Sequence, residues 1–204
     1  MSVAAVASSP VEAVCAAIAD EGCAVVDEFL SLKAVAALAA DARQRDAAGE
    51  FHPAGVGRGA ARSERPEIRG DRICWLDPSD RRFALRPWWL ALSALRMTLN
   101  ETLFLGLWAF EGHYTLYPTG SFYARHRDRF HDHDARVLSC VLYLNHEWNI
   151  GNGGALRLYC DDGALDVLPR GGTLVCFLSD RFEHEVLPAT RDRLALTGWF
   201  QRRS

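Results

Sequence analysis

The sequence of 204 residues lacks the patterns that mark secreted, zinc-binding and membrane proteins. No two of its six cysteines form a CxxC pair, and most lie in apolar runs, as Cys176 does at 174–177. We therefore expect buried, reduced thiols rather than disulfides or a zinc site. No apolar run approaches the ~20 residues of a membrane span, and the N-terminus lacks the basic start and apolar core of a signal peptide. We expect a cytoplasmic protein without membrane association.

The chain also lacks an excess of charge of either sign. It has 23 basic and 26 acidic residues, for a net charge of −3. Because nucleic-acid binding generally needs a basic surface, this balance gives no strong signal for such a partner. The apolar fraction of 49% is that of a folded globular protein.

Internal repeats, low-complexity tracts and a second-domain boundary are missing too. The length fits one domain with a sizeable core, so we expect a single domain over 1–204. A GxSxG motif is also absent, so Ser179 and Asp180 lack the nucleophile elbow of an α/β-hydrolase although His184 is near in sequence.

Helical patterns dominate the first half of the sequence. Ser9 precedes Pro10 at one expected helix start, Ser31 caps a second helix, and Pro87 begins a third. Residues 1–103 are thus expected to be mostly helical support covering one face of a sheet. The expected elements are helices over 11–20, 32–48 and 88–103, and strands over 23–27 and 72–76.

From about residue 104 the pattern changes to short strands separated by turn residues. A start as late as Glu111 stays open for the first strand. Eight antiparallel strands after a helical start predict an α+β, mainly β protein: a double-stranded β-helix, or jelly roll, with supporting N-terminal helices. The eight candidates are 104–117, 121–127, 136–146, 155–160, 164–168, 173–178, 183–188 and 193–202.

Two histidines and one carboxylate on these strands form a candidate metal site. His126 and Asp128 are two residues apart, so on a strand their side chains point the same way, and His184 comes from a later strand. These are the side chains of the facial triad that binds non-haem Fe(II) and leaves other coordination positions open. We predict that all three are metal ligands and catalytic residues. The alternative is a polar barrel interior whose histidines are only hydrogen-bonded.

Arg193 opens the last expected strand and shares one face with Ala195, Thr197 and Trp199. A guanidinium group binds a carboxylate through two parallel hydrogen bonds, and the Thr197 hydroxyl adds a donor beside it. This pattern predicts a dicarboxylic acid cosubstrate next to the iron. A zinc hydrolase would use similar metal ligands but would not explain the arginine.

The motifs of this region match a known family in their order. They lie at residues 117–118, 123–128, 142–145, 153–157, 171–174, 184–186 and 193–199, with an upstream block at 68–75. In these motifs the chain resembles the 2-oxoglutarate- and Fe(II)-dependent dioxygenases. It is most similar to protein prolyl 4-hydroxylases of the hypoxia-inducible-factor prolyl hydroxylase type, and especially to their bacterial relatives.

The resemblance implies a reaction and its cofactors. Fe(II), 2-oxoglutarate and O2 would be used, with ascorbate in a supporting role, and succinate and CO2 would be released. The expected partner is a cytosolic protein or peptide with a target proline, hydroxylated at C4. The resemblance also implies cofactor-binding residues: Arg193 and Tyr143 for the distal carboxylate of 2-oxoglutarate, and Tyr117 and Thr197 in the same pocket.

At the substrate entrance the resemblance implies an ion pair between Asp71 and Arg136, with Trp199 as a wall of the active site. It further implies that the glycine- and arginine-rich segment 49–68 is a loop that closes over a peptide, although a plain surface loop stays open as the alternative. The basic loop and the ion pair favour an extended peptide over a free amino acid. His131 and His133 belong to a second His/Asp cluster, at residues 131–134, which we expect to consist of solvated turn residues.

Several alternatives remain open at this stage. The enzyme could act on a free amino acid, another small molecule or a nucleic acid, because related folds act on very different molecules. A cupin-like metal-binding module without catalysis is the non-enzyme alternative. We expect a monomer or weak dimer. A role as an oxygen sensor depends on the affinity for O2, which no motif encodes.

Overall fold

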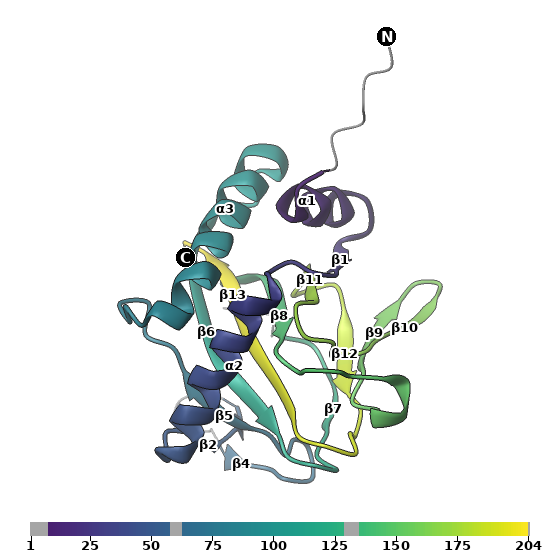
Figure 1. Ribbon diagram of the computed structural model, residues 1–204. Coiled ribbons are helices and arrows are strands. Elements are labelled where there is room, and N and C mark those ends of the chain that lie inside the picture. The colour runs from purple at the N-terminus through teal and green to yellow at the C-terminus, as the bar shows by residue number, and fades with distance from the viewer. Residues whose placement is uncertain (1–7, 58–62, 129–134, 204) are drawn as a thin grey trace.

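The computed structural model describes residues 8–57, 63–128 and 135–203 (Figure 1). Its helices are α1 (Pro10–Glu21), α2 (Leu32–Ala47) and α3 (Arg86–Leu103), with short 3-10 turns at Phe83–Leu85 and Ile150–Asn152. The strands are β1 (Cys23–Val26), β2 (His52–Pro53), β3 (Gly55–Val56), β4 (Ser63–Glu64), β5 (Arg72–Trp75), β6 (Leu107–Tyr117), β7 (Tyr123–His126), β8 (Arg136–Tyr143), β9 (Leu156–Cys160), β10 (Gly163–Val167), β11 (Leu174–Leu178), β12 (Glu183–Val186) and β13 (Arg193–Arg202).

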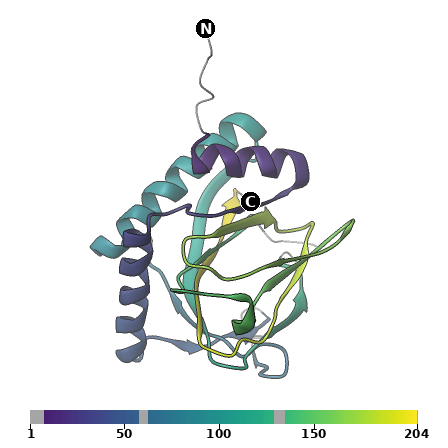
Figure 2. The same cartoon turned by 45° about the vertical axis from the view of Figure 1, so that its right-hand side comes forward.

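Two antiparallel sheets make up the β core. The larger has the order β1-β11-β8-β13-β6-β5-β2 and the smaller the order β10-β9-β12-β7, while β3 and β4 form a separate ribbon. The two sheets curve around a common interior, which is visible from the side in Figure 2. The predicted double-stranded β-helix with supporting N-terminal helices is thus confirmed.

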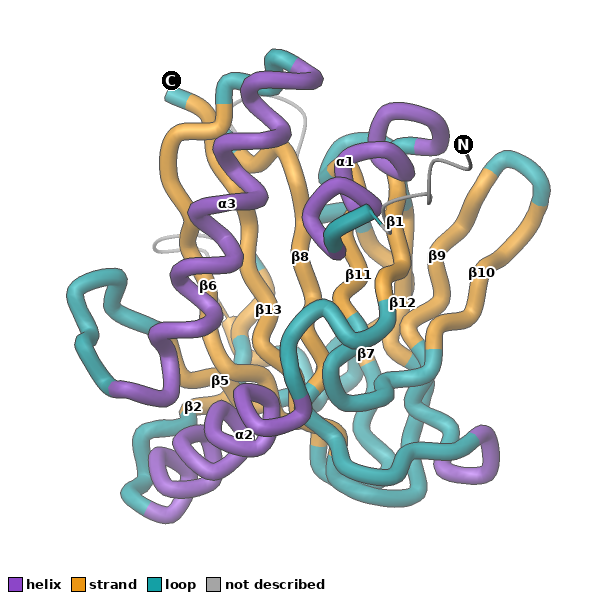
Figure 3. The backbone as a smooth tube through the Cα atoms, turned by 45° about the horizontal axis from the view of Figure 1, so that its top comes forward, coloured by secondary structure: helices purple, strands orange, loops and turns teal. Residues whose placement is uncertain are grey.

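The three helices cover the outer face of the larger sheet (Figure 3). Side chains on β8 show how one strand serves both faces. Leu138 and Cys140 pack in the core beneath the helices, whereas Val141 and Tyr143 point into the interior between the sheets. The helical layer therefore shields one face of the sheet and leaves the other face free to line a site.

Local sequence chemistry accounts for the helix ends. Ser9 accepts a hydrogen bond from the backbone of Glu12, whose side chain accepts one from Ser9 N, so α1 begins with a capping box. The helix ends at Gly22, whose φ of 76° is readily adopted only by glycine. Ser31 caps α2 by a single contact, accepting a hydrogen bond from Ala34 N. The three predicted helices are confirmed to within two residues at each end.

All eight predicted strands from residue 104 onward are present, and the first begins at Leu107. The segment 49–68 is more structured than a plain loop, because it carries β2, β3 and β4, although residues 58–62 lie outside the described part. The six cysteines are all free, and only Cys160 is partly exposed. Among the described helices, none has the length and apolar character needed to cross a membrane. The assignment of 1–204 to a single dioxygenase domain stays a prediction.

Candidate active site

The smaller sheet brings the three predicted metal ligands together. His126 on β7 and His184 on β12 are paired across adjacent antiparallel strands. Strand β7 ends at His126, so Asp128 lies just beyond the strand rather than on it. Its carboxylate oxygens are nevertheless 3.6 Å from His126 Nε2 and 3.7 Å from His184 Nε2. One ligand atom from each residue lies within 4.8 Å of the others, a spacing that suits a single metal ion.

Backbone contacts present the correct nitrogen of each histidine. His126 Nδ1 lies 2.8 Å from Ala124 O, and His184 Nδ1 lies 3.4 Å from Phe182 O. A carbonyl only accepts, so Nδ1 carries the proton and Nε2 keeps its lone pair for a metal. Burial lowers the pKa of His184 to about 4, with partial opposition from Asp128. The imidazole is therefore neutral near pH 7, the form that binds metals.

Asp128 is ionised in this setting. Burial alone would raise its pKa, but His184 and His126, together with Trp199, lower the pKa well below the usual range of a carboxyl group. The side chain is 11% exposed. The site thus offers two neutral imidazoles and one carboxylate, and a divalent cation would compensate the buried negative charge.

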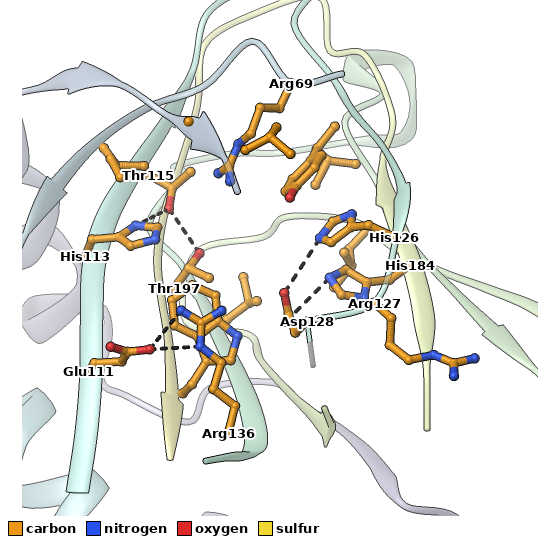
Figure 4. Close-up of a pocket in the computed structure, with 18 of the residues that line it drawn as sticks. Arg69, Glu111, His113, Thr115, His126, Arg127, Asp128, Arg136, His184 and Thr197 are labelled. Carbon is orange, nitrogen blue, oxygen red and sulfur yellow. Dashed lines mark hydrogen bonds and ion pairs between the residues drawn. The ribbon is translucent and has the colours of Figure 1, made fainter. Parts of the chain in front are cut away.

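These ligands lie in one wall of a cavity of about 830 Å³. Figure 4 shows His126, Asp128 and His184 on one side and His113, Thr115 and Thr197 across from them. Aromatic and aliphatic side chains complete the walls, including Ile73, Trp75, Tyr123 and Trp199. The volume exceeds what one small dicarboxylic acid needs, so a second molecule can enter beside it.

Arg193 lines this cavity and is only 2% exposed. Its Nε donates to Gly154 O at 2.8 Å, whereas its Nη2 is buried without a hydrogen-bond partner among the described residues. The hydroxyl of the fully buried Tyr143 is also unpartnered there, and burial raises the pKa of Tyr143 to about 12 although Arg193 opposes the shift. Buried donors of this kind are almost always satisfied. A carboxylate between them would accept from both, so these residues fit the distal end of 2-oxoglutarate.

Two neighbours complete this pocket. The ring centroids of Tyr117 and Tyr143 are 5.2 and 5.0 Å from the guanidinium carbon of Arg193. Tyr117 pairs with Arg193 across β6 and β13, and burial raises its pKa well above the usual value. Gly154 adopts a φ of 70°, and an added Cβ there would approach Ala189 Cβ to 2.9 Å. Only glycine therefore lets this backbone carbonyl reach Arg193.

A hydrogen-bonded row of polar side chains faces the metal ligands. Thr115 Oγ1 is 3.1 Å from Thr197 Oγ1 and 2.9 Å from His113 Nδ1. Since Nδ1 of His113 also lies 3.2 Å from Tyr114 O, it carries the proton, and the Thr115 hydroxyl is left to donate to Thr197. The Thr197 hydroxyl is then free to donate into the cavity, as the sequence suggested.

The expected ion pair between Asp71 and Arg136 is corrected by the structure. Asp71 is held by Arg69 through two hydrogen bonds of 2.7 and 2.6 Å. Arg136 instead pairs with Glu111 at 2.8 Å and stacks on Trp199, 3.6 Å from its ring centroid. Arg69 lies only two residues from Asp71 on an extended segment, so the nearer cation takes this carboxylate.

Sequence reasoning missed several residues that shape this site. Tyr123 stacks on His126 with 3.6 Å between ring centroids and a 16° angle between the planes. On its other face Arg69 lies 4.2 Å from the ring centroid. His113, Thr115 and Tyr117 are spaced two residues apart on β6, so their side chains share one face of the strand. Because Tyr117 was already a predicted pocket residue, this spacing could have identified His113 and Thr115. The predicted turn residues His131 and His133 lie outside the described residues.

Comparisons with known proteins agree with this site. The family model of the 2OG-Fe(II) oxygenase superfamily matches residues 112–201. The chain is 29% identical over 193 residues to Egl nine homolog 1 of Homo sapiens, a match that covers 88% of this chain and 43% of that protein. It spans about half the length of the first such relatives, between 43% and 55%.

Solved structures are similar over a larger share of their length. A prolyl-4-hydroxylase of Pseudomonas putida is 47% identical, with a TM-score of 0.86 over 95% of this chain and 100% of that one. A prolyl hydroxylase of Trichoplax adhaerens, in complex with a peptide fragment of the hypoxia-inducible factor oxygen degradation domain, is 26% identical. Its TM-score is 0.85 over 94% of this chain and 88% of that chain.

Proposed function

The chain belongs to the 2OG-Fe(II) oxygenase superfamily, enzymes that use Fe(II), 2-oxoglutarate and O2, and on that premise we propose that it hydroxylates a prolyl residue of a protein at C4. The observation that carries the proposal is the content of one cavity. Its walls hold the His126, Asp128 and His184 cluster, several aromatic side chains, and Arg193, whose buried Nη2 has no partner among the described residues. The Tyr143 ring lies 5.0 Å from the guanidinium carbon of Arg193, and its hydroxyl is unpartnered there as well.

Each residue has a role in this reaction. His126, Asp128 and His184 would hold the iron, while Arg193 and Tyr143 would anchor the distal carboxylate of 2-oxoglutarate. When bound, the metal with 2-oxoglutarate and O2 supplies the chemistry that replaces a substrate C–H hydrogen with a hydroxyl group and releases succinate and CO2. The protein positions the reacting groups and excludes water, since the ligands lie in a largely buried cavity.

The apolar side chains in the cavity wall support a prolyl substrate. Tyr123 and Trp199 offer flat aromatic surfaces, and Ile73 adds an aliphatic one, as the non-polar pyrrolidine ring requires. Two of the cations in the wall, Arg69 and Arg136, have acidic partners in Asp71 and Glu111, and this neutralisation favours an uncharged residue within a chain. A free amino acid would bring two charges that need partners of their own.

The shape of the entrance supports an extended peptide. A second hollow of about 390 Å³ adjoins the cavity and shares Gly55, Ile73 and Trp75 with it. Its remaining wall comes from β2 and β4, within the segment expected to close over the substrate. Residues flanking the target proline would lie here. Closure of 49–68, a cytoplasmic location and stimulation by ascorbate are parts of the same proposal, and the six free cysteines are in keeping with a reducing compartment.

Mass spectrometry tests the proposal directly. A cytosolic lysate is incubated with the enzyme, Fe(II) and 2-oxoglutarate, and Asp128→Ala protein serves as the control. We expect a one-oxygen gain on a proline of one protein, absent in the control, and amino-acid analysis should identify 4-hydroxyproline. Consumption of 2-oxoglutarate without any modified peptide would contradict the protein substrate and direct the search to small molecules and nucleic acids.

A further inference from the structure

Two buried serines connect the carboxylate ligand to the larger sheet. Ser139 Oγ donates to Asp128 Oδ2 at 2.7 Å, and Ser179 Oγ lies 2.9 Å from Ser139 Oγ. Both serines are fully buried, with 0% exposure. We propose that Ser139 and Ser179 form a relay that positions Asp128 for one-oxygen metal binding. This inference rests on the metal site of the proposed function.

The direction of each hydrogen bond follows from which groups carry a proton to donate. An ionised carboxylate only accepts, so the single hydroxyl proton of Ser139 is used on Asp128 Oδ2. Ser139 must then accept from Ser179, whose hydroxyl proton points along the relay. A donor that accepts a hydrogen bond itself is polarised and donates more strongly. Ser179 therefore strengthens and aims the contact that Ser139 makes with the carboxylate.

The relay crosses from one sheet to the other. Ser139 lies on β8, and Ser179 directly follows β11, its neighbour in the larger sheet. The amide of Ser179 donates to Val137 O at 3.0 Å, which keeps the second serine in place. Asp128 follows β7 of the smaller sheet. The carboxylate lies beyond the end of its own strand, so this contact from the opposite sheet fixes its rotation.

Fixed rotation matters because a free carboxylate presents two equivalent oxygens. Ser139 uses one lone pair of Oδ2, which also lies 3.7 Å from His184 Nε2. Oδ1, 3.6 Å from His126 Nε2, therefore has more lone-pair capacity left for the metal. One-oxygen binding uses a single coordination position and leaves more of them for cosubstrate and O2. Contacts of this kind to a metal ligand typically change metal affinity about 10- to 100-fold.

The test compares metal binding by Ser139→Ala, Ser179→Ala and the double variant, with Mn(II) titration and the visible absorption of Co(II) as readouts. We expect Ser139→Ala to weaken Mn(II) binding about 10- to 100-fold and to alter the Co(II) spectrum. Ser179→Ala should have a smaller effect of the same kind. Because one relay is broken in either case, the double variant should bind no more weakly than Ser139→Ala alone.

Thr173→Val is the matched control. Thr173 is buried and donates to Asp27 Oδ1 at 2.6 Å, so this variant also removes a hydroxyl–carboxylate hydrogen bond, but away from the metal site. It should keep wild-type Mn(II) affinity, and thermal unfolding of the metal-free proteins shows which variants are folded at the titration temperature. Wild-type affinity and an unchanged Co(II) spectrum in Ser139→Ala would overturn the proposal, and additive effects would remove Ser179 from it.

The experiment separates this inference from the proposed function. Failure of the wild-type protein to bind Mn(II), or unchanged binding in His184→Ala, would refute the metal site itself. Normal metal binding without a hydroxyprolyl product would refute only the proposed prolyl substrate. The serine variants would still test the relay, because their readout is metal binding.

Discussion

Arg193 is a buried cation whose Nη2 donor has no hydrogen-bond partner among the described residues. At the residue scale this makes it the clearest anchor for an anion. The Nε–H group of Arg193 already donates to the Gly154 carbonyl, so the position of Nη2 is set before any ligand enters. Tyr143 presents its hydroxyl to the same place. Preorganised donors of this kind bind a carboxylate without a reorganisation penalty.

Arg193→Ala should therefore weaken 2-oxoglutarate binding to the Mn(II)-loaded protein roughly 10- to 100-fold, since hydrogen bonds to charged groups contribute ~1.5–3 kcal/mol. Tyr143→Phe, which removes only the hydroxyl, should cause a smaller loss. Isothermal titration calorimetry measures both, with Mn(II) affinity as the control. Equal loss of metal and 2-oxoglutarate binding in Arg193→Ala would argue against the assigned role.

His113 makes a separate prediction about pH. Burial lowers its pKa to about 4, partly opposed by Asp71, so the folded state holds it neutral. Below the unfolded value of about 6.5 the unfolded chain binds an additional proton, so stability is fully present above pH 6.5 and falls toward pH 4. The part of the loss between pH 7 and pH 5 that is due to His113 is expected to be about 2 kcal/mol.

Urea unfolding of the metal-free protein at both pH values measures the total loss, to which His184 also contributes because burial lowers its pKa to about 4 as well. His113→Gln keeps a polar side chain without the titration, so its stability should fall less over the same interval. The same fall in both proteins would show that other groups carry the pH dependence.

At the scale of elements, α2 is tied to the larger sheet through a buried ion cluster. Arg45 on α2 contacts Asp41 at 2.9 Å and also Asp80, and its side chain is 6% exposed. Tyr114 on β6 donates to Asp41 Oδ2 at 3.1 Å. The cluster therefore sets where the helix lies on the sheet, in addition to the apolar packing between them.

Arg45→Ala should destabilise the protein by about 3 kcal/mol, the lower end of the range for breaking a buried ion pair. It leaves the buried Asp41 with only the partly exposed Arg82, 3.1 Å away, as a cationic partner. Arg72→Ala is the control, since Arg72 makes a partly exposed ion pair with Asp46, with side chains 38% and 30% exposed. An exposed pair of this kind contributes only about 0–1 kcal/mol. Urea unfolding at one pH compares the two, and similar losses would contradict the structural role of the cluster.

At the scale of the whole molecule, the proposed ligands would bridge the two sheets. His126, Asp128 and His184 belong to the smaller sheet or its loop, whereas Arg193 and Tyr143 lie on the larger one. A metal with 2-oxoglutarate between them would connect both halves of the β-helix. Binding to the folded state alone stabilises it according to ligand concentration and affinity.

Mn(II) with 2-oxoglutarate should therefore raise the unfolding temperature, and EDTA should reverse the change. At a ligand concentration 100 times Kd the expected stabilisation is about 2.7 kcal/mol. Differential scanning fluorimetry measures the shift, and His184→Ala should show little of it. An equal rise in that variant would place the binding elsewhere. The expected state of a monomer or weak dimer remains a prediction, for which light scattering is the measurement.

Much of this architecture could be predicted because its signals are local. Capping by Ser9 and Ser31, the helical period of the first half and the alternation along the later strands all act within a few residues. The His126 and Asp128 spacing and the position of Arg193 were visible for the same reason. The family resemblance added their expected roles.

Other features depended on neighbours far apart in the sequence. Arg136 meets Glu111 across β13 and over Trp199, a choice of partner made by sheet order rather than by spacing. The contact from Ser139 to Asp128 joins opposite sheets in the same way. Sequence by itself determined the elements and the chemical identity of the site, since these follow from short-range preferences. Only the tertiary structure decided which charges and hydroxyls meet, because distance in the folded chain sets the strength of every such contact.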